Sequence, residues 1–317
     1  MEKFTPIEFQ QARDFSKKLN ITFEFIRQNF KSLGKSLLYI SGPVVLIGSL
    51  LTGSLYSGYL NSITETSQNP NSVLGFVTST QTWAQGAAAV LFIFMGGIVI
   101  VSVVYNYMLE YHARKDNRIE VDAVWNRVKE TLPQYLATFF LFFVVVILAY
   151  VLIVLLIAGT ARLSIGLAIF TGFITIILLI YAIIPLSLIF VVRAFEKVGF
   201  IKAIERCFEL ISGKWWSTFG LLVIVGLVQS MLASVFFIPW YINFIINMMH
   251  NLDGGGVYEP SAASQLINNV FLTLYFLSSF LLYALPLIAL AFQYFNLVEL
   301  KESRGLMSRI EQMGNAG

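Results

Sequence analysis

The stretch that decides the fold lies at residues 135–158 and reads YLATFFLFFVVVILAYVLIVLLIA, without a charged side chain. A helix needs about 20 apolar residues to cross the hydrocarbon core of a bilayer, so this stretch predicts a membrane span. Five further stretches meet the same requirement. The six predicted spans are about 36–59, 83–109, 135–158, 164–192, 215–240 and 266–297.

The basic residues are distributed asymmetrically around these stretches. Of the 21 Lys and Arg residues, all except Arg162 lie in residues 1–35, 299–317 or the two connections 110–134 and 193–214. Because Lys and Arg accumulate on the cytoplasmic side of membrane proteins, both termini are predicted to be cytoplasmic. Anionic lipid head groups at that face are the predicted partners of these cations.

Composition supports a membrane-embedded chain. Hydrophobic residues make up 57% and charged residues 12%, against about 45–50% and 25% in typical soluble domains. We therefore expect one helical bundle in the membrane, whose first span is an uncleaved anchor rather than a signal peptide. The single cysteine, Cys207, rules out an internal disulfide and is expected to pack passively. No basic face with stacking aromatics points to nucleic acid.

Amphipathic helical stretches precede the outward-going spans. In each, apolar side chains recur at steps of three and four and form one stripe. The stripes are Phe15, Leu19, Phe23, Ile26, Phe30, Leu33 and Leu37; Val121, Val124, Trp125, Val128 and Leu132; and Phe200, Ile204, Cys207, Phe208 and Ile211. Such helices lie in the membrane interface, with basic residues such as Lys17 and Lys18 toward the head groups. A shorter fourth copy is predicted at Leu306, Ile310 and Met313.

The predicted fold class is an all-α integral membrane protein. Six transmembrane helices form three pseudo-repeated hairpins, each preceded by a cytoplasmic interfacial helix. Residues 1–35 are assigned to the first interfacial helix, 36–298 to the transmembrane domain and 299–317 to a cytoplasmic tail. The returning spans end alike, with a polar residue at a matching point: Asn106, Arg193 and Gln293. This match favours an internal repeat.

No ionisable side chain lies near the middle of a predicted span. Because intramembrane charges mark proton relays and ion pathways, this pattern argues against a proton- or sodium-coupled pump and leaves neutral transport open. Gln229, the strongest polar residue within a span, is either a substrate contact or a helix–helix hydrogen bond. Pro185 and Pro286 either kink their helices or line a transport site with Gln229. The kink is favoured, because both prolines lie in helices of the same direction.

Small residues recur at four-residue steps in several of the spans, and two rows contain three such residues. The rows are Ser49, Gly53 and Ser57 in the first span, and Gly226, Ser230 and Ser234 in the fifth. Rows of this kind let two helices approach closely. Each row is therefore predicted to be an internal packing seam or a docking seam for another membrane subunit.

Chemistry-bearing constellations are not evident. His112 and His250 are predicted on opposite sides of the membrane, and no carboxylate pair, Ser-His-Asp set or glycine-rich phosphate loop occurs. The sequence therefore predicts no catalytic, cofactor-binding or metal-binding residue.

Two stretches resemble a known family. Residues 195–204 (FEKVGFIKAI), followed by Phe208-Glu209-Leu210 and by GKWW at 213–216, resemble the helix-to-span junction in bacterial six-span proteins similar to the membrane domain of glycerophosphodiester phosphodiesterases. Residues 23–30 (FEFIRQNF) and 37–43 (LLYISGP) resemble a branch of the same group. The resemblance implies a stand-alone membrane domain in the bacterial cytoplasmic (inner) membrane, beside other membrane subunits and without the phosphodiesterase domain.

The function predicted from these patterns is structural. We expect a non-enzymatic accessory or scaffold subunit of a cytoplasmic-membrane complex, which presents basic loops and small-residue seams to other membrane protein subunits. The alternative is a transporter or channel for a neutral or lipid-like substrate that uses Gln229, Pro185 and Pro286.

Overall fold

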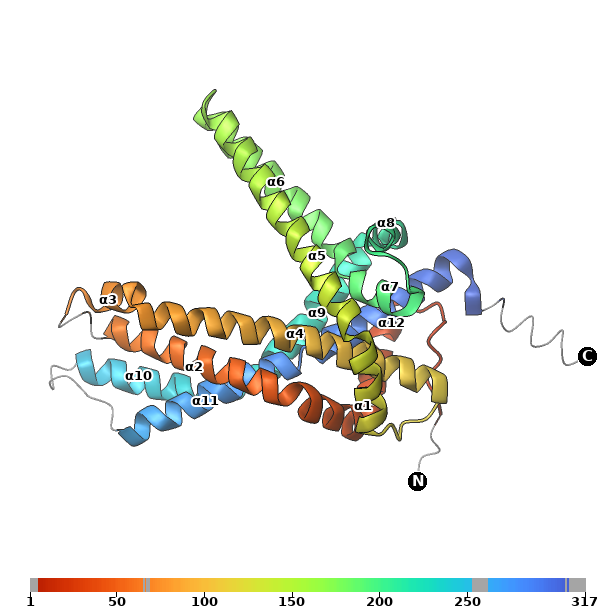
Figure 1. The fold of residues 1–317 in the computed structure, drawn as a ribbon, viewed down its shortest axis with the longest axis horizontal. Helices are drawn as coiled ribbons and strands as arrows, with labels where there is room; N and C mark the ends of the chain where they lie inside the picture. Colours follow the sequence, from red (N-terminus) through yellow and green to blue (C-terminus); the bar gives the residue numbers. More distant parts are fainter. Residues whose placement is uncertain (1–4, 65, 67–68, 253–261, 306, 308–317) are drawn as a thin grey trace, which may run out of the picture. The chain divides into compact units, whose positions relative to one another are not determined.

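The computed structural model describes residues 5–64, 66, 69–252, 262–305 and 307. Every regular element in these residues is helical (Figure 1). The elements are α1 Phe15–Ser36, the π-helix η1 Leu37–Ser41, α2 Gly42–Thr64, α3 Ser72–Thr78, α4 Thr80–Arg114, α5 Val121–Ala161, α6 Ile165–Leu186, α7 Ile189–Glu196, α8 Phe200–Ile211, α9 Trp215–Ser234, α10 Ile238–Leu252, α11 Ala262–Leu281 and α12 Ala284–Glu302. The predicted fourth amphipathic copy, at Leu306, Ile310 and Met313, lies outside the described residues.

Six helical segments of the described chain are long and apolar enough to cross a membrane. They contain or overlap the six predicted stretches, and the prediction of a multi-pass helical membrane protein is confirmed at this level. The segments are Phe15–Ile63, Thr80–Arg114, Val121–Ala161, Ile165–Glu196, Trp215–Ser234 and Gln265–Glu302.

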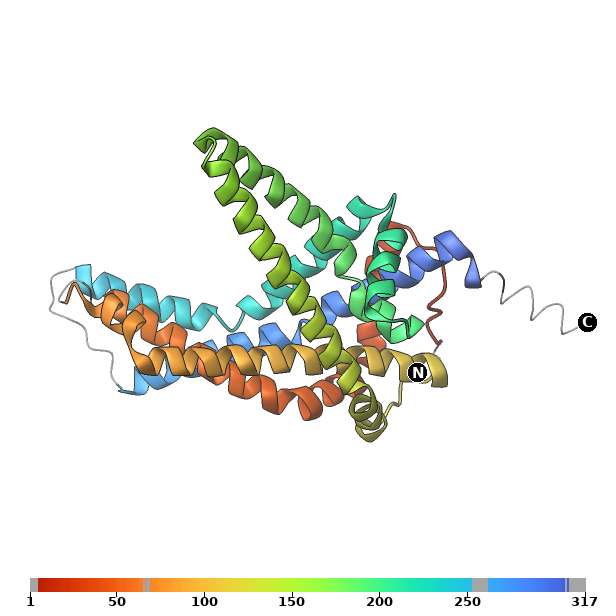
Figure 2. The same ribbon diagram turned by 45° about the horizontal axis from the view of Figure 1, so that its top comes forward.

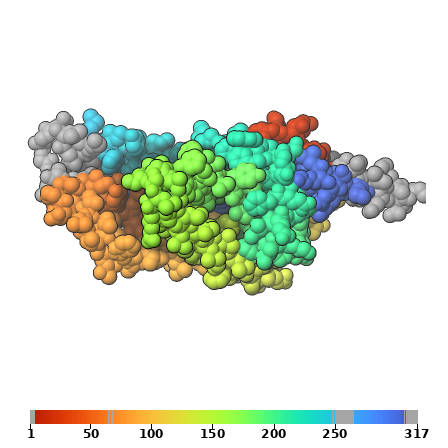
Figure 3. Space-filling view, turned by 90° about the horizontal axis from the view of Figure 1, so that it is seen from above, coloured from red at the N-terminus to blue at the C-terminus, as the bar shows by residue number. Residues whose placement is uncertain are grey.

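The hairpin of α5 and α6 shows most directly that lipid is the solvent. The two helices lie side by side in both ribbon views (Figures 1 and 2), and they lie open on the surface in the space-filling view (Figure 3). No side chain between residues 139 and 183 is buried, although nearly all are apolar. An apolar surface of this extent is unstable in water but suits the acyl chains of a bilayer.

Two amphipathic stretches differ from the expected separate helices. α1, η1 and α2 follow one another without a loop, and α5 runs from the second amphipathic stretch through Pro133 into its span. The π-helix ends two residues before Pro43, which has no N–H to donate to a helical hydrogen bond. The turn before Pro43 is wider than an α-helical turn, because the Gly42 N–H donates to the Leu37 carbonyl five residues earlier. Among the three described stretches, only α8 forms a helix of its own.

Three predicted spans are interrupted where prolines and turns lie. The predicted span 215–240 divides into α9 and α10, and Pro239 is the second residue of α10, where a missing N–H costs least. The predicted spans 164–192 and 266–297 are interrupted at residues 187–188 and 282–283. Hydropathy did not reveal these breaks, because the turn residues are themselves largely apolar.

The chain forms two compact units. One contains the described parts of residues 1–33, 104–225 and 286–317, and its central helix is α12, in which every residue from Pro286 to Val298 is buried. The other contains residues 34–103 and the described parts of 226–285. In that unit α2 and α11 pack side by side (Figure 1).

The face of α1 that packs inside its unit coincides with the predicted apolar stripe only near the end of the helix, at Leu33. Lys18, Thr22, Phe25, Asn29 and Leu33 are buried, whereas Phe23 and Phe30 of the stripe are exposed. The expectation that Lys18 faces the head groups is therefore wrong. A helix surrounded by lipid turns its apolar side chains outward and keeps its polar side chains for the bundle.

Candidate functional site

The first small-residue row is an internal seam. Ser49 is fully buried and its hydroxyl donates to the Val45 carbonyl at 2.7 Å. A Cβ added to Gly53 would lie 3.2 Å from Thr273 Oγ1 and 3.3 Å from Thr273 N on α11. Ser57 is half-buried at the C-terminal end of the row. Of the two predicted roles, close packing of α2 against α11 is the one that the geometry fits.

The second row lies in different surroundings. A Cβ added to Gly226 would meet no atom within 4 Å, and Ser230 and Ser234 are both exposed. Large exposed apolar side chains stand beside the row, among them Leu227 and Met231. This part of α9 is thus a shallow strip of small residues on an apolar surface.

Gln229 joins two helices. Its Nε2 donates to the Ser279 carbonyl on α11 at 3.0 Å. Of the two interpretations of Gln229, the helix–helix hydrogen bond is the one with a partner in the structure.

Pro185 has a specific structural partner. A proline removes the hydrogen bond to the carbonyl four residues earlier, which here belongs to Tyr181. The indole Nε1 of Trp215 donates to this Tyr181 carbonyl at 3.0 Å, and the Trp215 and Tyr181 rings stack with centroids 6.0 Å apart. α9 therefore satisfies the acceptor that Pro185 leaves open in α6. Pro286 lies in the first turn of α12, where no helical partner is lost.

The matched polar residues of the returning helices all bond to threonines. Asn106 Nδ2 donates to Thr131 Oγ1 at 2.7 Å, and Gln293 Nε2 donates to Thr218 Oγ1 at 2.8 Å. Arg193 Nη1 donates to Thr138 Oγ1. Thr138 and Thr218 are both buried, and each is followed by phenylalanine in the sequence. These contacts favour the predicted repeat for the second and third hairpins.

A buried lysine, Lys18, binds Gln293, the polar residue of the last returning helix. Lys18 is 3% exposed, and its Nζ donates to Ser217 Oγ at 2.7 Å and to Gln293 Oε1 at 2.8 Å. The Phe15 ring lies 5.5 Å away. This site is not among those predicted from the sequence, although the helical spacing of Lys18, Thr22 and Asn29 is a signal for it.

The N-terminal segment before α1 packs into an aromatic cluster. Phe9 is buried among Phe25, Tyr111 and Phe292, with ring centroids 5.5–6.1 Å away. The backbone N–H of Arg13 donates to Asn296 Oδ1 at 2.6 Å. Burial lowers the pKa of Arg13, and the guanidinium is held by carbonyl oxygens of its own segment, including Phe9 O at 3.1 Å.

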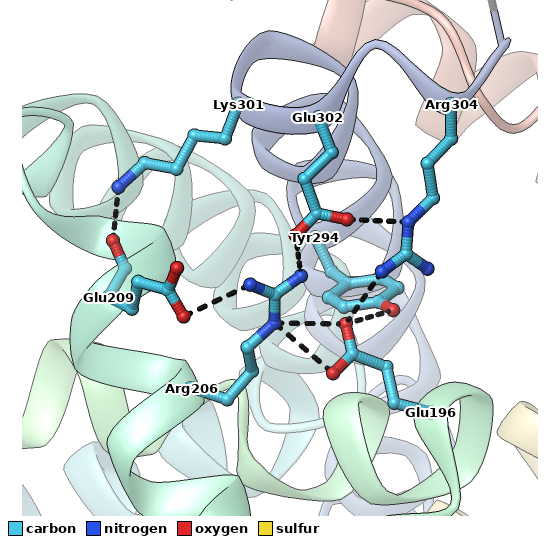
Figure 4. A network of polar contacts seen from close by, with 7 residues as sticks. All are labelled: Glu196, Arg206, Glu209, Tyr294, Lys301, Glu302 and Arg304. Atoms are coloured by element: carbon cyan, nitrogen blue, oxygen red, sulfur yellow. Dashed lines mark hydrogen bonds and ion pairs between the residues drawn. The ribbon is translucent and has the colours of Figure 1, made fainter. Parts of the chain in front are cut away.

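An ion-pair cluster holds α8 to α7 and α12 (Figure 4). Arg206 Nε lies 3.1 Å from Glu196 Oε1, Arg206 Nη1 lies 3.0 Å from Glu209 Oε2, and Nη2 pairs with Glu302. Tyr294 donates to Glu196 Oε1 at 3.0 Å. Burial works to lower the pKa of Arg206, but its hydrogen bonds to Glu302 and Glu209 and the charge of Glu196 outweigh burial and raise the pKa. The arginine thus stays charged and crosslinks three helices.

Cys207 and the acidic residues show no catalytic arrangement in the part of the chain that the structure describes. Burial raises the pKa of the Cys207 thiol to about 12, so the sulfur packs as a neutral side chain. Within the described residues, no group of three or more His, Cys, Asp or Glu side chains could hold a metal ion.

No family model, curated protein or solved structure matches this chain. The resemblance of residues 195–216 and 23–43 to a family of membrane domains therefore stays a prediction. The polar groups described above bond mainly to one another and join helices. The exposed apolar surface of α9 includes the open row Gly226, Ser230 and Ser234.

Proposed function

We propose that the chain is a non-enzymatic accessory or scaffold subunit of a complex in the bacterial cytoplasmic membrane, with both termini in the cytoplasm. The observation that carries the proposal is the open row Gly226, Ser230 and Ser234, which belongs to a candidate span and has no helix packed on it among the described residues of its own compact unit. Helices in lipid associate through such rows, because small residues allow close approach of two backbones.

The contrast between the two rows supports this assignment. The row Ser49, Gly53 and Ser57 has the same four-residue spacing, and α11 of the same chain packs against it. The second row has the same chemistry without a partner in the described part of its own compact unit, so a helix of another membrane subunit is the occupant that fits it. The transport alternative has less support, since Gln229 and the acceptor opened by Pro185 are both engaged in helix packing.

Purification from native membranes in mild detergent tests the proposal. The wild-type chain should carry at least one membrane protein at constant stoichiometry. Gly226→Leu with Ser230→Leu fills the row and should lose that protein while keeping its own thermal stability. Leu232→Ile, at an exposed position of α9 off the row, is the matched control and should retain the partner. Isolation of the wild-type chain as a lone monomer, or retention of the partner by the filled-row variant, contradicts the proposal.

A further inference from the structure

α8 has three faces with different surroundings. Ala203, Cys207, Leu210 and Ile211 are buried against the protein. Lys202, Glu205 and Glu209 lie on an exposed polar face. Between these two faces runs an apolar edge formed by Ile201, which is 74% exposed, and Phe208, which is 38% exposed; the half-buried Ile204 completes it.

The chain holds α8 at the end of its neighbouring apolar helices. Three residues separate Glu196 at the end of α7 from α8, and three separate α8 from Trp215 at the start of α9. Three extended residues reach about 11 Å at most. Since α6–α7 and α9 belong to candidate spans, α8 is tethered near the membrane surface at both ends.

The ion-pair cluster fixes how α8 is turned. Arg206 projects from α8 to Glu196 of α7 and Glu302 of α12 and is 15% exposed (Figure 4). A helix fastened in this way cannot rotate freely about its axis. Its apolar edge therefore keeps one direction, away from the buried face and beside the polar face.

Exposed cations and an aromatic side chain lie around this edge. Lys197 precedes α8, Lys202 lies within it and Lys214 follows it, and all three are exposed. Trp216, in the first turn of α9, is 77% exposed. The nearby acids are Glu205 and Glu209, and Glu209 is bonded to Arg206. An amphipathic ring and several lysines beside an apolar edge match the acyl and head-group layers of an anionic membrane surface.

We propose that the edge Ile201–Ile204–Phe208 inserts at the acyl boundary and that Lys197, Lys202 and Lys214 bind the head groups of anionic phospholipids. The site is a lipid-charge-dependent anchor for α8. It does not depend on the scaffold function, because a chain without a protein partner would use the same surface.

Spin labels on the full chain in lipid nanodiscs test this proposal. In a Cys207→Ala background, labels are placed by Ile201→Cys, Phe208→Cys or Glu205→Cys. The labels at positions 201 and 208 should be several-fold more accessible to oxygen than to a water-soluble nickel chelate, and the label at 205 should show the reverse. If positions 201 and 205 are equally accessible to nickel, the edge faces water and the proposal is wrong.

The dependence on lipid charge is measured with the same labels. Adding phosphatidylglycerol to phosphatidylcholine nanodiscs should move the label of I201C deeper, and the combined variant Lys197→Gln, Lys202→Gln and Lys214→Gln should abolish that shift. The matched variant Lys31→Gln, Lys35→Gln and Lys115→Gln removes the same charge elsewhere and should keep the shift. The head-group site is wrong if adding phosphatidylglycerol leaves the depth of the label unchanged. It is also wrong if both triple variants lose the depth shift equally. Native mass spectrometry of bound phosphatidylglycerol on the unlabelled triple variants checks the result without spin labels.

Discussion

Individual backbone groups in this protein find unusual partners, because lipid offers them no hydrogen bonds. Pro185 leaves the Tyr181 carbonyl without its helical donor, and the Trp215 indole supplies one from α9. In water such a carbonyl would be solvated. In a membrane, a side chain of a neighbouring helix has to satisfy it.

Trp215→Phe should therefore destabilise the protein by about 1–3 kcal/mol, the cost of an unsatisfied polar group. In a Pro185→Ala background the restored backbone N–H bonds to the Tyr181 carbonyl, so the same substitution should cost clearly less. Reversible unfolding in mixed micelles measures both effects as a double-mutant cycle. Equal costs in the two backgrounds would show that the indole acts only by packing.

Gln293 is the second residue whose removal should be costly. It accepts from the buried Lys18 ammonium at 2.8 Å and donates to Thr218. Gln293→Leu leaves a buried cation with one fewer acceptor and should lower the free energy of unfolding by about 3 kcal/mol. In a Lys18→Met background the loss should be much smaller. An undiminished loss in that background would contradict a role for Gln293 as a ligand of the lysine.

For single residues, the sequence predicts where polar side chains lie in the helices, but it does not predict the groups to which they bond. The matching polar points Asn106, Arg193 and Gln293 were found from their place at the ends of returning spans. From the sequence, Lys18 is expected at the head groups, because it looks no different from its neighbours Lys17 and Lys31. Apart from the helical spacing that Lys18 shares with Thr22 and Asn29, only the packed bundle distinguishes a lysine on the inner face of α1 from one on its outer face.

Helices of this protein place the same small-residue spacing in two different surroundings. Gly53→Val inserts a branched side chain 3.2–3.3 Å from Thr273 and should destabilise the protein by about 1–3 kcal/mol through overpacking. Gly226→Val points into open space and should change stability by a few tenths of that value. Thermal unfolding of both variants in one detergent makes the comparison; equal destabilisation would contradict the assignment of the two rows.

At the scale of whole helices, the ion pairs of Arg206 are expected to hold α8 in place. Arg206→Gln removes the cation that pairs with Glu196 and Glu302, and amide exchange in α8 should accelerate more than tenfold, which corresponds to about 1.4 kcal/mol. Glu209→Gln is the control, because Glu209 is 63% exposed and exposed pairs contribute little. Hydrogen–deuterium exchange followed by mass spectrometry measures the exchange rates of α8 in both variants. An unchanged rate in Arg206→Gln would show that apolar packing alone holds α8.

Hydropathy predicts that the long helices exist, but it does not predict where they begin, break and end. The run of residues 135–158 predicts a helix from composition alone. The break between α9 and α10 depends on Pro239 within a continuously apolar stretch. Fusion of α1 with α2 through η1 depends on how the backbone accommodates Pro43. Such details arise from local hydrogen bonding, to which a hydropathy average is insensitive.

Across the whole molecule, the decisive choice is lipid as the solvent of the six helical segments. That choice explains why residues 139–183 are uncovered and why polar side chains such as Lys18 and Gln293 are buried. It also explains why the sequence predicted the fold class well and the site poorly. Apolar length decides membrane insertion, while a partner surface depends on which small-residue rows remain uncovered after packing.

Cysteine accessibility in intact cells tests the central claim most directly. In a Cys207→Ala background, single substitutions are made at Lys115 and Lys202 on the predicted inner side, and at Asn71 and Arg162 on the predicted outer side. A membrane-impermeant maleimide should react with N71C and R162C in intact cells, and with K115C and K202C only after the membrane is permeabilised. Reaction of K115C or K202C in intact cells would contradict the six-span arrangement with cytoplasmic termini.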